Sequence, residues 1–216
     1  MKSVLIIGMS KFGVILAEKM QAFGNEVMIV DREEEVINEL SPMFTNAMIA
    51  NCTNPAVIEK LSVGSFDICF VTVSGDFQSS LEITSLLKEY GAKVVVSVAD
   101  RDIQKKFLLK NGADEVVYPI RDIAEKVAIR YNTKNIFDYI ELTGEYAIFE
   151  IAVPHKWVGK SIVGINVRKT HNINILAIKK SSLLIPMPEA SYVFEKQDHA
   201  IVMGRHDDVY MLLPNK

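Results

Sequence analysis

The sequence predicts an α/β chain in which a doubly wound parallel sheet is followed by a small α+β lobe. From residue 2 to about residue 118, short apolar runs alternate with segments of helical period, the pattern of parallel strands joined by crossover helices. A polar stretch at residues 132–135 then leads into a different pattern. The 216 residues are 49% hydrophobic and 24% charged, a balance typical of a chain that buries a core. We therefore expect two domains, residues 1–135 and residues 136–216.

Six apolar runs are expected to form the strands of the first domain. Several are rich in Val and Ile, as is typical of strands that are covered on both faces. Six such strands suffice for a full doubly wound sheet. The runs are Val4–Ile7, Val27–Val30, Ala47–Ala50, Ile68–Val73, Val94–Val98 and Glu115–Tyr118.

Four segments around these strands predict helices. Phe12–Phe23 carries its apolar residues on one face at helical spacing, and Gly24 follows as a C-cap glycine would. Asn54 is expected to cap a short helix that has proline at its first position and runs to Leu61. The other two segments are Gln78–Tyr90 and Asp122–Tyr131.

The second domain is small, with few predicted elements. Strands are expected at Tyr146–Val153, Ile173–Lys179 and Ala200–Gly204, with a helix or turn over Gly159–Thr170 and a short helix after the last strand. The fraction of surface that a domain buries falls as the domain shrinks. We therefore expect this lobe to lean on a neighbour or to dimerise.

The strongest motif runs from Gly8 to Gly13, directly after the first strand and at the start of the first helix. This is the context of the Rossmann dinucleotide fingerprint, in which glycines allow the tight turn and the close helix packing, and free amides attract phosphate. Ser10 stands in place of the middle glycine, and its side chain adds a steric cost. The alternative is that the two glycines serve only the turn and the packing.

Polar residues follow the next strands of the predicted sheet. Asp31 ends the second strand, where an acidic side chain accepts hydrogen bonds from ribose hydroxyls. Because Arg32 lies beside it, a ribose that carries a 2′-phosphate is not excluded as a ligand. The third and fourth strands are followed by residues 51–54 and 74–76, which should reach the same edge of the sheet. Adenine contacts are one interpretation, and helix capping and chain turning are the other. From these loops we take as candidate cofactor-binding residues Gly8, Ser10, Lys11, Phe12, Gly13, Asp31, Arg32, Asn51, Cys52, Thr53 and Ser74.

Several classes of function are disfavoured. The formal net charge is −3 and no basic stripe is present, so nucleic acid is a poor candidate partner. The two cysteines have no metal-binding spacing, which indicates a reducing compartment and no metal site. No apolar run approaches the ~20 residues that span a bilayer, so we expect a cytoplasmic protein. The four histidines all lie in the second domain without a catalytic spacing, and we expect them on the surface, in a chain that is not an enzyme.

Taken with these loops, several further motifs resemble the cytoplasmic regulatory subunits of Ktr/Trk-type bacterial potassium uptake systems, which carry RCK domains. The resemblance covers nearly the whole chain. Beyond the glycine loop, Asp31 and residues 50–53, it rests on Gln78-Ser-Ser80, Gly112-Ala-Asp114, Tyr118-Pro119 and the stretch Gly159-Lys-Ser161…Arg168…Asn174-Ile-Leu-Ala-Ile-Lys179.

The resemblance implies an RCK N-lobe with a linker helix and a small RCK C-lobe, assembled as dimers into an octameric ring on a membrane-embedded potassium transporter subunit. It implies that ATP and ADP compete for one groove and switch the ring between conducting and closed states. In this arrangement the glycine loop lines the pyrophosphate and Asp31 and Arg32 flank the ribose. Asn51 and Thr53 border the adenine, and Lys11 reaches a γ-phosphate across the ring.

Two further implications concern cations and a second ligand. Relatives typically carry a glutamate after Tyr-Pro that helps to bind a cation, whereas this chain has Ile120. The C-lobe of the family can bind cyclic di-AMP between two protomers, and the matching positions are Arg168, Asn174, Ile175 and Pro188. These four residues could equally serve strand and turn packing.

Two other classes of function remain open. The same glycine loop and Asp31 favour an NAD-dependent oxidoreductase that binds NAD(H), although no catalytic constellation accompanies them. Because Ser10 replaces a glycine of the motif, the other alternative is an interaction module whose groove binds no nucleotide. Binding measurements with ATP, ADP, NADH and cyclic di-AMP separate the three.

Overall fold

The computed structural model describes residues 1–132 and 135–213. The contacts divide the chain into two units, Met1–Arg121 and Asp122–Lys216, which we describe separately. Helix α6, Pro119–Asn132, starts in the first unit and continues in the second. We expected the boundary near residue 135, and the polar link expected at residues 132–135 lies partly outside the described residues.

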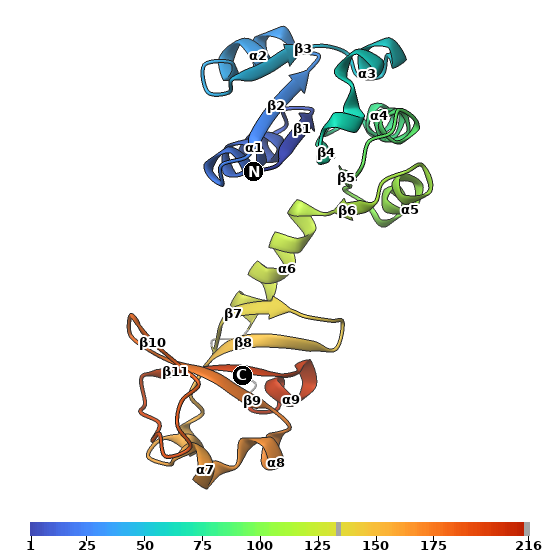
Figure 1. The fold of residues 1–216 in the computed structure, drawn as a ribbon. Coiled ribbons are helices and arrows are strands. Elements are labelled where there is room, and N and C mark those ends of the chain that lie inside the picture. The colour runs from blue at the N-terminus through green and yellow to red at the C-terminus, as the bar shows by residue number, and fades with distance from the viewer. Residues whose placement is uncertain (133–134, 214–216) are drawn as a thin grey trace. The chain divides into compact units, whose positions relative to one another are not determined.

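The first unit contains the doubly wound parallel sheet that the sequence predicts. All neighbouring strands pair in parallel, in the order β3-β2-β1-β4-β5-β6. The chain moves outward from β1 to β3 and then returns to pair β4 with β1, so the winding direction reverses between β1 and β4. The strands are β1 Ser3–Ile7, β2 Glu26–Asp31, β3 Asn46–Ile49, β4 Ile68–Val71, β5 Val95–Val98 and β6 Glu115–Val117 (Figure 1).

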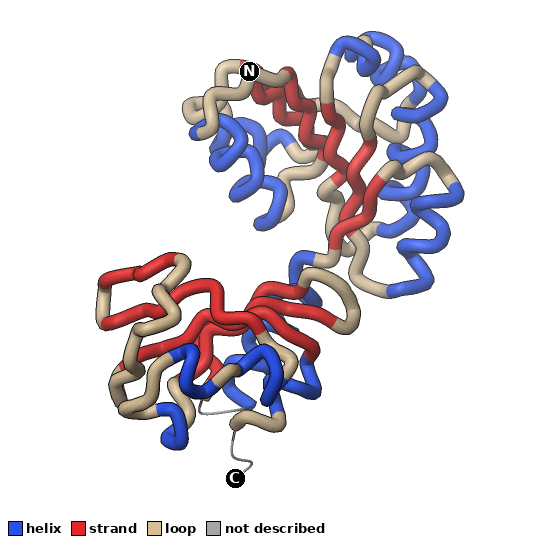
Figure 2. The backbone as a smooth tube through the Cα atoms, turned by 60° about the horizontal axis from the view of Figure 1, so that its bottom comes forward, coloured by secondary structure: helices blue, strands red, loops and turns tan. Residues whose placement is uncertain are grey.

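Helices cover both faces of this sheet (Figure 2). Alternate residues of each strand point to opposite sides, so apolar side chains on both faces need a helix to pack against. In β1, Val4 and Ile6 pack on the side of α1 and α2, whereas Leu5 and Ile7 pack on the side of α3 and α4. The connecting elements are α1 Lys11–Ala22, α2 Glu34–Leu40, α3 Pro55–Leu61, the 3-10 turn η1 Val63–Ser65, α4 Phe77–Glu89 and α5 Asp102–Lys110.

Helices α2 and α5 were not predicted, and their composition explains why. Helix α2 has only seven residues, of which Ile37 and Leu40 are buried, and its acidic start hides the helical period. Helix α5 buries Gln104 and Leu108 but exposes Ile103 and Phe107, so its apolar residues do not mark one buried face.

The second unit is an antiparallel sheet with short helices. The strand order is β10-β9-β11-β8-β7, and β7 and β10 were not predicted. The segment 159–170, expected as a helix or turn, contains α7 and most of α8. The elements are β7 Ile136–Glu141, β8 Tyr146–Ala152, the 3-10 turn η2 His155–Trp157, α7 Ile162–Ile165, α8 Val167–His171, β9 Asn174–Lys180, β10 Leu183–Pro186, β11 Asp198–Arg205 and α9 His206–Tyr210.

The core of the second unit corrects one expectation about the histidines. Trp157 is 1% exposed and packs on Phe194, with ring centroids 5.4 Å apart. His155 is exposed, but His171, His199 and His206 are half-buried. Full surface exposure was therefore found only for His155, because the rings of the other three contact aromatic neighbours within this unit: His199 is stacked on Phe137, His206 is edge-on to Phe149, and His171 is tilted against Trp157.

Neither a spanning helix nor a metal cluster is found in residues 1–132 and 135–213. No helix there combines the length and the apolar character that crossing a bilayer requires. Those residues also contain no group of three or more His, Cys, Asp or Glu side chains arranged to hold a metal ion.

Candidate functional site

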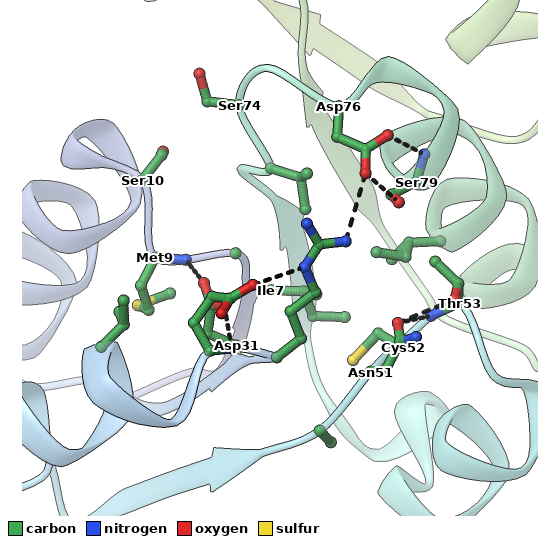
Figure 3. A pocket seen from close by; sticks show the side chains of 17 residues that line it. Ile7, Met9, Ser10, Asp31, Asn51, Cys52, Thr53, Ser74, Asp76 and Ser79 are labelled. Atoms are coloured by element: carbon green, nitrogen blue, oxygen red, sulfur yellow. Dashed lines mark hydrogen bonds and ion pairs between the residues drawn. The ribbon is translucent and has the colours of Figure 1, made fainter.

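A groove opens at the carboxyl ends of β1 and β4, where the winding direction reverses. Ligands of open α/β sheets bind in this crevice, because the loops that follow the two central strands diverge there to opposite faces. Residues from the loops after β1, β2, β3 and β4 line the groove, and Figure 3 shows their side chains converging on it. The sequence motifs that follow these strands thus meet at one place.

The glycine loop needs both of its glycines for steric reasons. Gly8 has φ +92°, and a Cβ there would lie 2.8 Å from the backbone nitrogen of Val73. A Cβ on Gly13 would lie 2.5 Å from the carbonyl oxygen of Gly8 and 2.5 Å from Oγ1 of Thr72. Gly8 therefore permits the turn, and Gly13 permits the close approach of α1 to β4 and its loop.

Ser10 has a structural role that its place in the motif did not reveal. It is the N-cap of α1, and its Oγ accepts a hydrogen bond from the amide of Gly13 at 3.3 Å. The amides of Lys11 and Phe12 have no hydrogen-bond acceptor in the part of the chain that the structure describes. The first turn of α1 therefore presents free donors and the positive end of the helix dipole.

Asp31 ends β2 and connects two loops at the wall of the groove. Its Oδ2 accepts a hydrogen bond from the amide of Met9 at 2.6 Å, and its Oδ1 accepts one from the amide of Glu33 at 2.9 Å. Figure 3 shows the Asp31 carboxylate against the glycine loop. An ionised carboxylate offers about four lone-pair positions, so these two bonds fix Asp31 and leave capacity for a ligand hydroxyl.

Arg32 carries the one positive charge among the side chains that line the groove in the described residues. Its Nε lies 3.1 Å from Oε1 of Glu33, and its Nη1 lies 3.5 Å from Oδ2 of Asp76. Asp76 caps α4, and hydrogen bonds from Ser79, together with Arg32, hold the pKa of its carboxyl below the ordinary value. The pair Arg32–Asp76 therefore links the loop after β2 to the loop after β4 with both groups charged.

The loop after β3 contributes polar and apolar surface. Oδ1 of Asn51 accepts hydrogen bonds from the amide of Thr53 at 3.1 Å and from its hydroxyl at 2.9 Å. Cys52 is 2% exposed, and burial together with the nearby Asp31 raises the pKa of its thiol to about 12. The thiol is therefore neutral at pH 7 and is not a nucleophile.

The structure brings most of the predicted N-terminal residues into one groove. Lys11 is exposed at the first position of α1, and it does not line the groove; neither do Phe12 and Gly13. Those that line it are Gly8, Ser10, Asp31, Arg32, Asn51, Cys52, Thr53 and Ser74. The groove is also lined by residues that were not among the candidates: Met9, Glu33, Val36, Asp76, Ser79 and Ile83. Residues 74–76 were expected at this edge of the sheet, but only Ser74 was taken as a candidate; the position of Asp76 after a strand and at the start of a helix was a signal for it as well.

A second cleft lies within the C-terminal unit, between α7, α8 and the start of β9. The four residues singled out in this lobe all line it: Arg168, Asn174, Ile175 and Pro188. Nε of Arg168 donates a hydrogen bond to Oδ1 of Asn174 at 3.0 Å. The exposed Val163 and the half-buried Ile162 add an apolar wall.

Comparison with known proteins identifies the family of both units. The TrkA-N domain model matches residues 4–119, and the TrkA-C domain model matches residues 146–215. The chain is 32% identical over 208 residues to Ktr system potassium uptake protein C of Bacillus subtilis (strain 168), covering 96% of this chain and 94% of that protein. It is 28% identical over 206 residues to Ktr system potassium uptake protein A of Vibrio alginolyticus, with 95% and 94% covered.

Solved structures share the fold. The crystal structure of the GsuK RCK domain superposes with a TM-score of 0.70 at 16% identity, over 99% of this chain and 48% of that one. The GsuK channel bound to NAD gives a TM-score of 0.71 at 16% identity, over 100% and 40%. This chain thus spans less than half of each of those chains. From its two domain matches and its Ktr relatives, the chain belongs to the TrkA-N/TrkA-C family of Ktr and Trk potassium uptake proteins.

Proposed function

We propose that this chain is the nucleotide-binding regulatory subunit of a potassium uptake system, in which ligand binding switches a membrane-embedded partner. The observation that carries the proposal is the groove at the β1/β4 reversal, where Asp31 and the glycine loop are joined by a hydrogen bond of 2.6 Å. The assignment to a potassium uptake system rests on the family to which the chain belongs. The relatives are named as potassium uptake proteins, and the solved channel binds NAD.

The chemistry of the groove favours binding over turnover. Its described lining contains no histidine and no lysine, and its one thiol is neutral. Asp31 and Asp76 are both engaged in hydrogen bonds that hold loops together. A regulatory site needs only a difference in affinity between two states of the protein, because that difference alone shifts their populations.

The proposed ligand is an adenine nucleotide, ATP or ADP, with NAD(H) as the alternative. The free amides at the start of α1 suit the pyrophosphate, and the spare lone pairs of Asp31 suit the ribose hydroxyls. Asn51, Thr53, Cys52 and Ser74 then border the base and the far side of the ligand. Because Arg32 is already paired with two carboxylates, a γ-phosphate needs a further cation. We assign that role to Lys11 acting toward a neighbouring subunit.

We do not expect the start of α6 to hold a divalent cation that strengthens nucleotide binding. Ile120 is 79% exposed and offers no oxygen, whereas hard divalent cations require oxygen ligands. ATP affinity should therefore depend only weakly on magnesium or calcium. A carboxylate-held divalent ion beside the γ-phosphate in an ATP complex would contradict this expectation.

Calorimetry of the full chain with ATP, ADP and NADH tests the proposal. Asp31→Ala should weaken adenine nucleotide binding by about 1–3 kcal/mol, the scale for a charge-assisted pair of hydrogen bonds. The matched control is Glu39→Ala, an exposed acidic residue on α2 that does not line the groove. Unchanged affinity in Asp31→Ala would refute the ribose assignment, and no binding of any of the three nucleotides would refute the function.

We further propose that the chain acts as a homo-oligomer, dimers of which form an octameric ring on the cytoplasmic face of its membrane partner. Helix α6 supports self-association, because Ile120, Ile123, Val127 and Tyr131 recur at helical spacing and are 49–79% exposed. Light scattering gives the mass in solution with and without ATP. A monomer under both conditions would contradict the ring.

The C-terminal cleft is a candidate for a second regulatory ligand, cyclic di-AMP. The observation in its favour is that Arg168, Asn174, Ile175 and Pro188 meet in one cleft, with a cation beside apolar surface. A two-fold ligand suits an isologous pair of lobes, where each Arg168 meets one phosphate. Arg168→Ala should abolish most of the affinity, and Lys196→Ala, which removes an exposed cation away from the cleft, should retain it. Full binding by Arg168→Ala would reject this site.

A further inference from the structure

A second cavity of the first unit lies beside the groove, at the carboxyl ends of β4 and β5. Its volume is about 290 Å³, the scale of a small metabolite. Val73, Phe77 and Val98 form its apolar wall, and the proposed nucleotide site leaves its polar groups unused. The cavity therefore has the mixed apolar and polar lining of a ligand site.

The loop after β4 separates this cavity from the groove. Ser74 and Asp76 line the groove, whereas Gly75 and Phe77 line the cavity. Figure 3 shows the Asp76 carboxylate pointing from this loop toward Ser79 and into the groove. Because alternate residues face opposite sides, the two spaces share one loop as a common wall, and Val73 contributes to both.

A buried hydroxyl beside the cavity has no partner among the described residues. Ser80 is 2% exposed, and its Oγ makes no hydrogen bond within residues 1–132 and 135–213. Thr84, one helical turn further on, contrasts with it, since its Oγ1 donates to the carbonyl of Ser80 at 2.7 Å and pairs with Oγ of Ser97 at 2.8 Å. Buried hydroxyls are normally satisfied, so the one on Ser80 indicates a missing acceptor or donor.

Two further donors line the cavity. Oε1 of Gln104 accepts hydrogen bonds from the amides of Asp100 at 2.8 Å and Arg101 at 3.1 Å, which fixes the carboxamide and leaves its NH₂ group for another acceptor. The guanidinium of Arg101 forms no ion pair in the described part of the chain. Ser80, Gln104 and Arg101 thus supply a hydroxyl, an amide and a cation around one space.

We propose that this cavity binds a small organic monocarboxylate, as a second ligand site distinct from the nucleotide groove. The carboxylate accepts hydrogen bonds from Ser80, Gln104 and Arg101, and its apolar part lies against the wall of valine and phenylalanine side chains. Asp100 is exposed at the rim of the cavity. Its negative charge repels a doubly charged ligand, such as the phosphate dianion, more strongly than a singly charged carboxylate.

The test is an NMR titration of the full chain with pyruvate, and in parallel with inorganic phosphate. Pyruvate should shift the amide signals of Gly75 and Val98 saturably, and should leave that of Asn51 in the groove in place. Arg101→Gln should weaken this binding about tenfold or more, because a charge-assisted hydrogen bond is lost. The matched control is Lys106→Gln, an exposed cation on α5, the helix whose N-cap is Arg101, that does not line the cavity.

A second variant separates binding from folding. Ser80→Ala removes the unpartnered hydroxyl, so it should weaken pyruvate binding several-fold and leave the melting temperature unchanged or higher. The proposal is overturned if pyruvate gives no saturable shift, if the shifts are confined to groove residues, if phosphate binds and pyruvate does not, or if Arg101→Gln binds as tightly as the wild type. Nucleotide binding in the groove is measured independently, so either proposal can fail alone.

Discussion

Replacing Gly13 by alanine sets two effects of known size against each other. In an ordinary helix interior the change stabilises by about 1 kcal/mol, because glycine loses more backbone entropy on folding. At this position the new Cβ would lie 2.5 Å from both the carbonyl oxygen of Gly8 and Oγ1 of Thr72. Neither atom can move freely, since Thr72 is 1% exposed and its hydroxyl is hydrogen-bonded to that same carbonyl. Helix α1 must therefore shift away from the sheet.

The steric effect should win. Overpacking of a close-packed site typically costs about 1–3 kcal/mol, so we expect Gly13→Ala to lose about that much stability. For a unit of this size the loss corresponds to a melting temperature lower by roughly 3–10 °C. The shift of α1 also moves the free amides of its first turn, so nucleotide affinity should fall with stability.

Urea denaturation followed by two signals checks this prediction. Trp157 is the one tryptophan and belongs to the second unit, so its fluorescence reports on that unit, whereas far-UV circular dichroism reports on both. The loss should appear in the dichroism transition. Gly144→Ala is the control, because no heavy atom of the described residues lies within 4 Å of its added Cβ, and it should change stability by less than about 0.5 kcal/mol. A Gly13→Ala protein as stable as the wild type would refute the packing argument.

Three other predictions concern single contacts. Ser10→Ala removes the N-cap bond to Gly13 and should cost about 0.5–2 kcal/mol in urea denaturation, whereas Ser10→Asp should retain most of the stability; equal losses in both would exclude capping. Hydrogen bonds from Lys88 lower the pKa of Asp114, so its contribution is present above the ordinary carboxyl pKa of about 3.9 and is lost as the pH falls through the folded value. Asp114→Asn should therefore be less stable than the wild type at pH 7, by about 0.5–1 kcal/mol for so exposed a pair, and the difference should close in acid; a gap that is constant with pH would contradict this. Cys52 should resist iodoacetamide in the folded protein and react fully in urea, as judged by mass spectrometry, because burial raises the pKa of its thiol to about 12; rapid labelling of the folded chain would contradict that burial.

Sequence pattern predicted the first sheet well because helices cover both of its faces and its central strands β1, β2, β4 and β5 are largely buried. Such strands read as continuous apolar runs, and each of the six has a counterpart in the structure. The strands β7 and β10 lacked that signal. In β7, residues Ile136 and Tyr139 are buried while Ile140 is exposed, because a bulge between Ile136 and Asp138 breaks the alternation. In β10, Leu183 and Leu184 are both exposed, so burial gives no period of two.

Some features of the groove could likewise be predicted from local sequence, whereas others depend on contacts between residues that are far apart in the chain. The glycine loop and Asp31 could be predicted from the sequence, since the spacing between a strand, a tight turn and a helix N-terminus is a local property. The capping role of Ser10 and the pairing of Arg32 with Asp76 could not. Arg32 and Asp76 lie 44 positions apart, and they meet only because β4 returns to pair with β1.

The sequence by itself therefore determined the fold class, the family resemblance and the edge of the sheet at which the candidate groove opens. Those features follow from the spacing of apolar residues along the chain and from residues, such as Gly8, that are needed for a particular backbone conformation. Only the tertiary structure decided which side chains line the groove, which line the neighbouring cavity, and which polar groups, such as the hydroxyl of Ser80, have no partner within the described residues. The reason is physical, because burial and hydrogen bonding of a side chain depend on elements that are distant in sequence and are brought together by strand pairing.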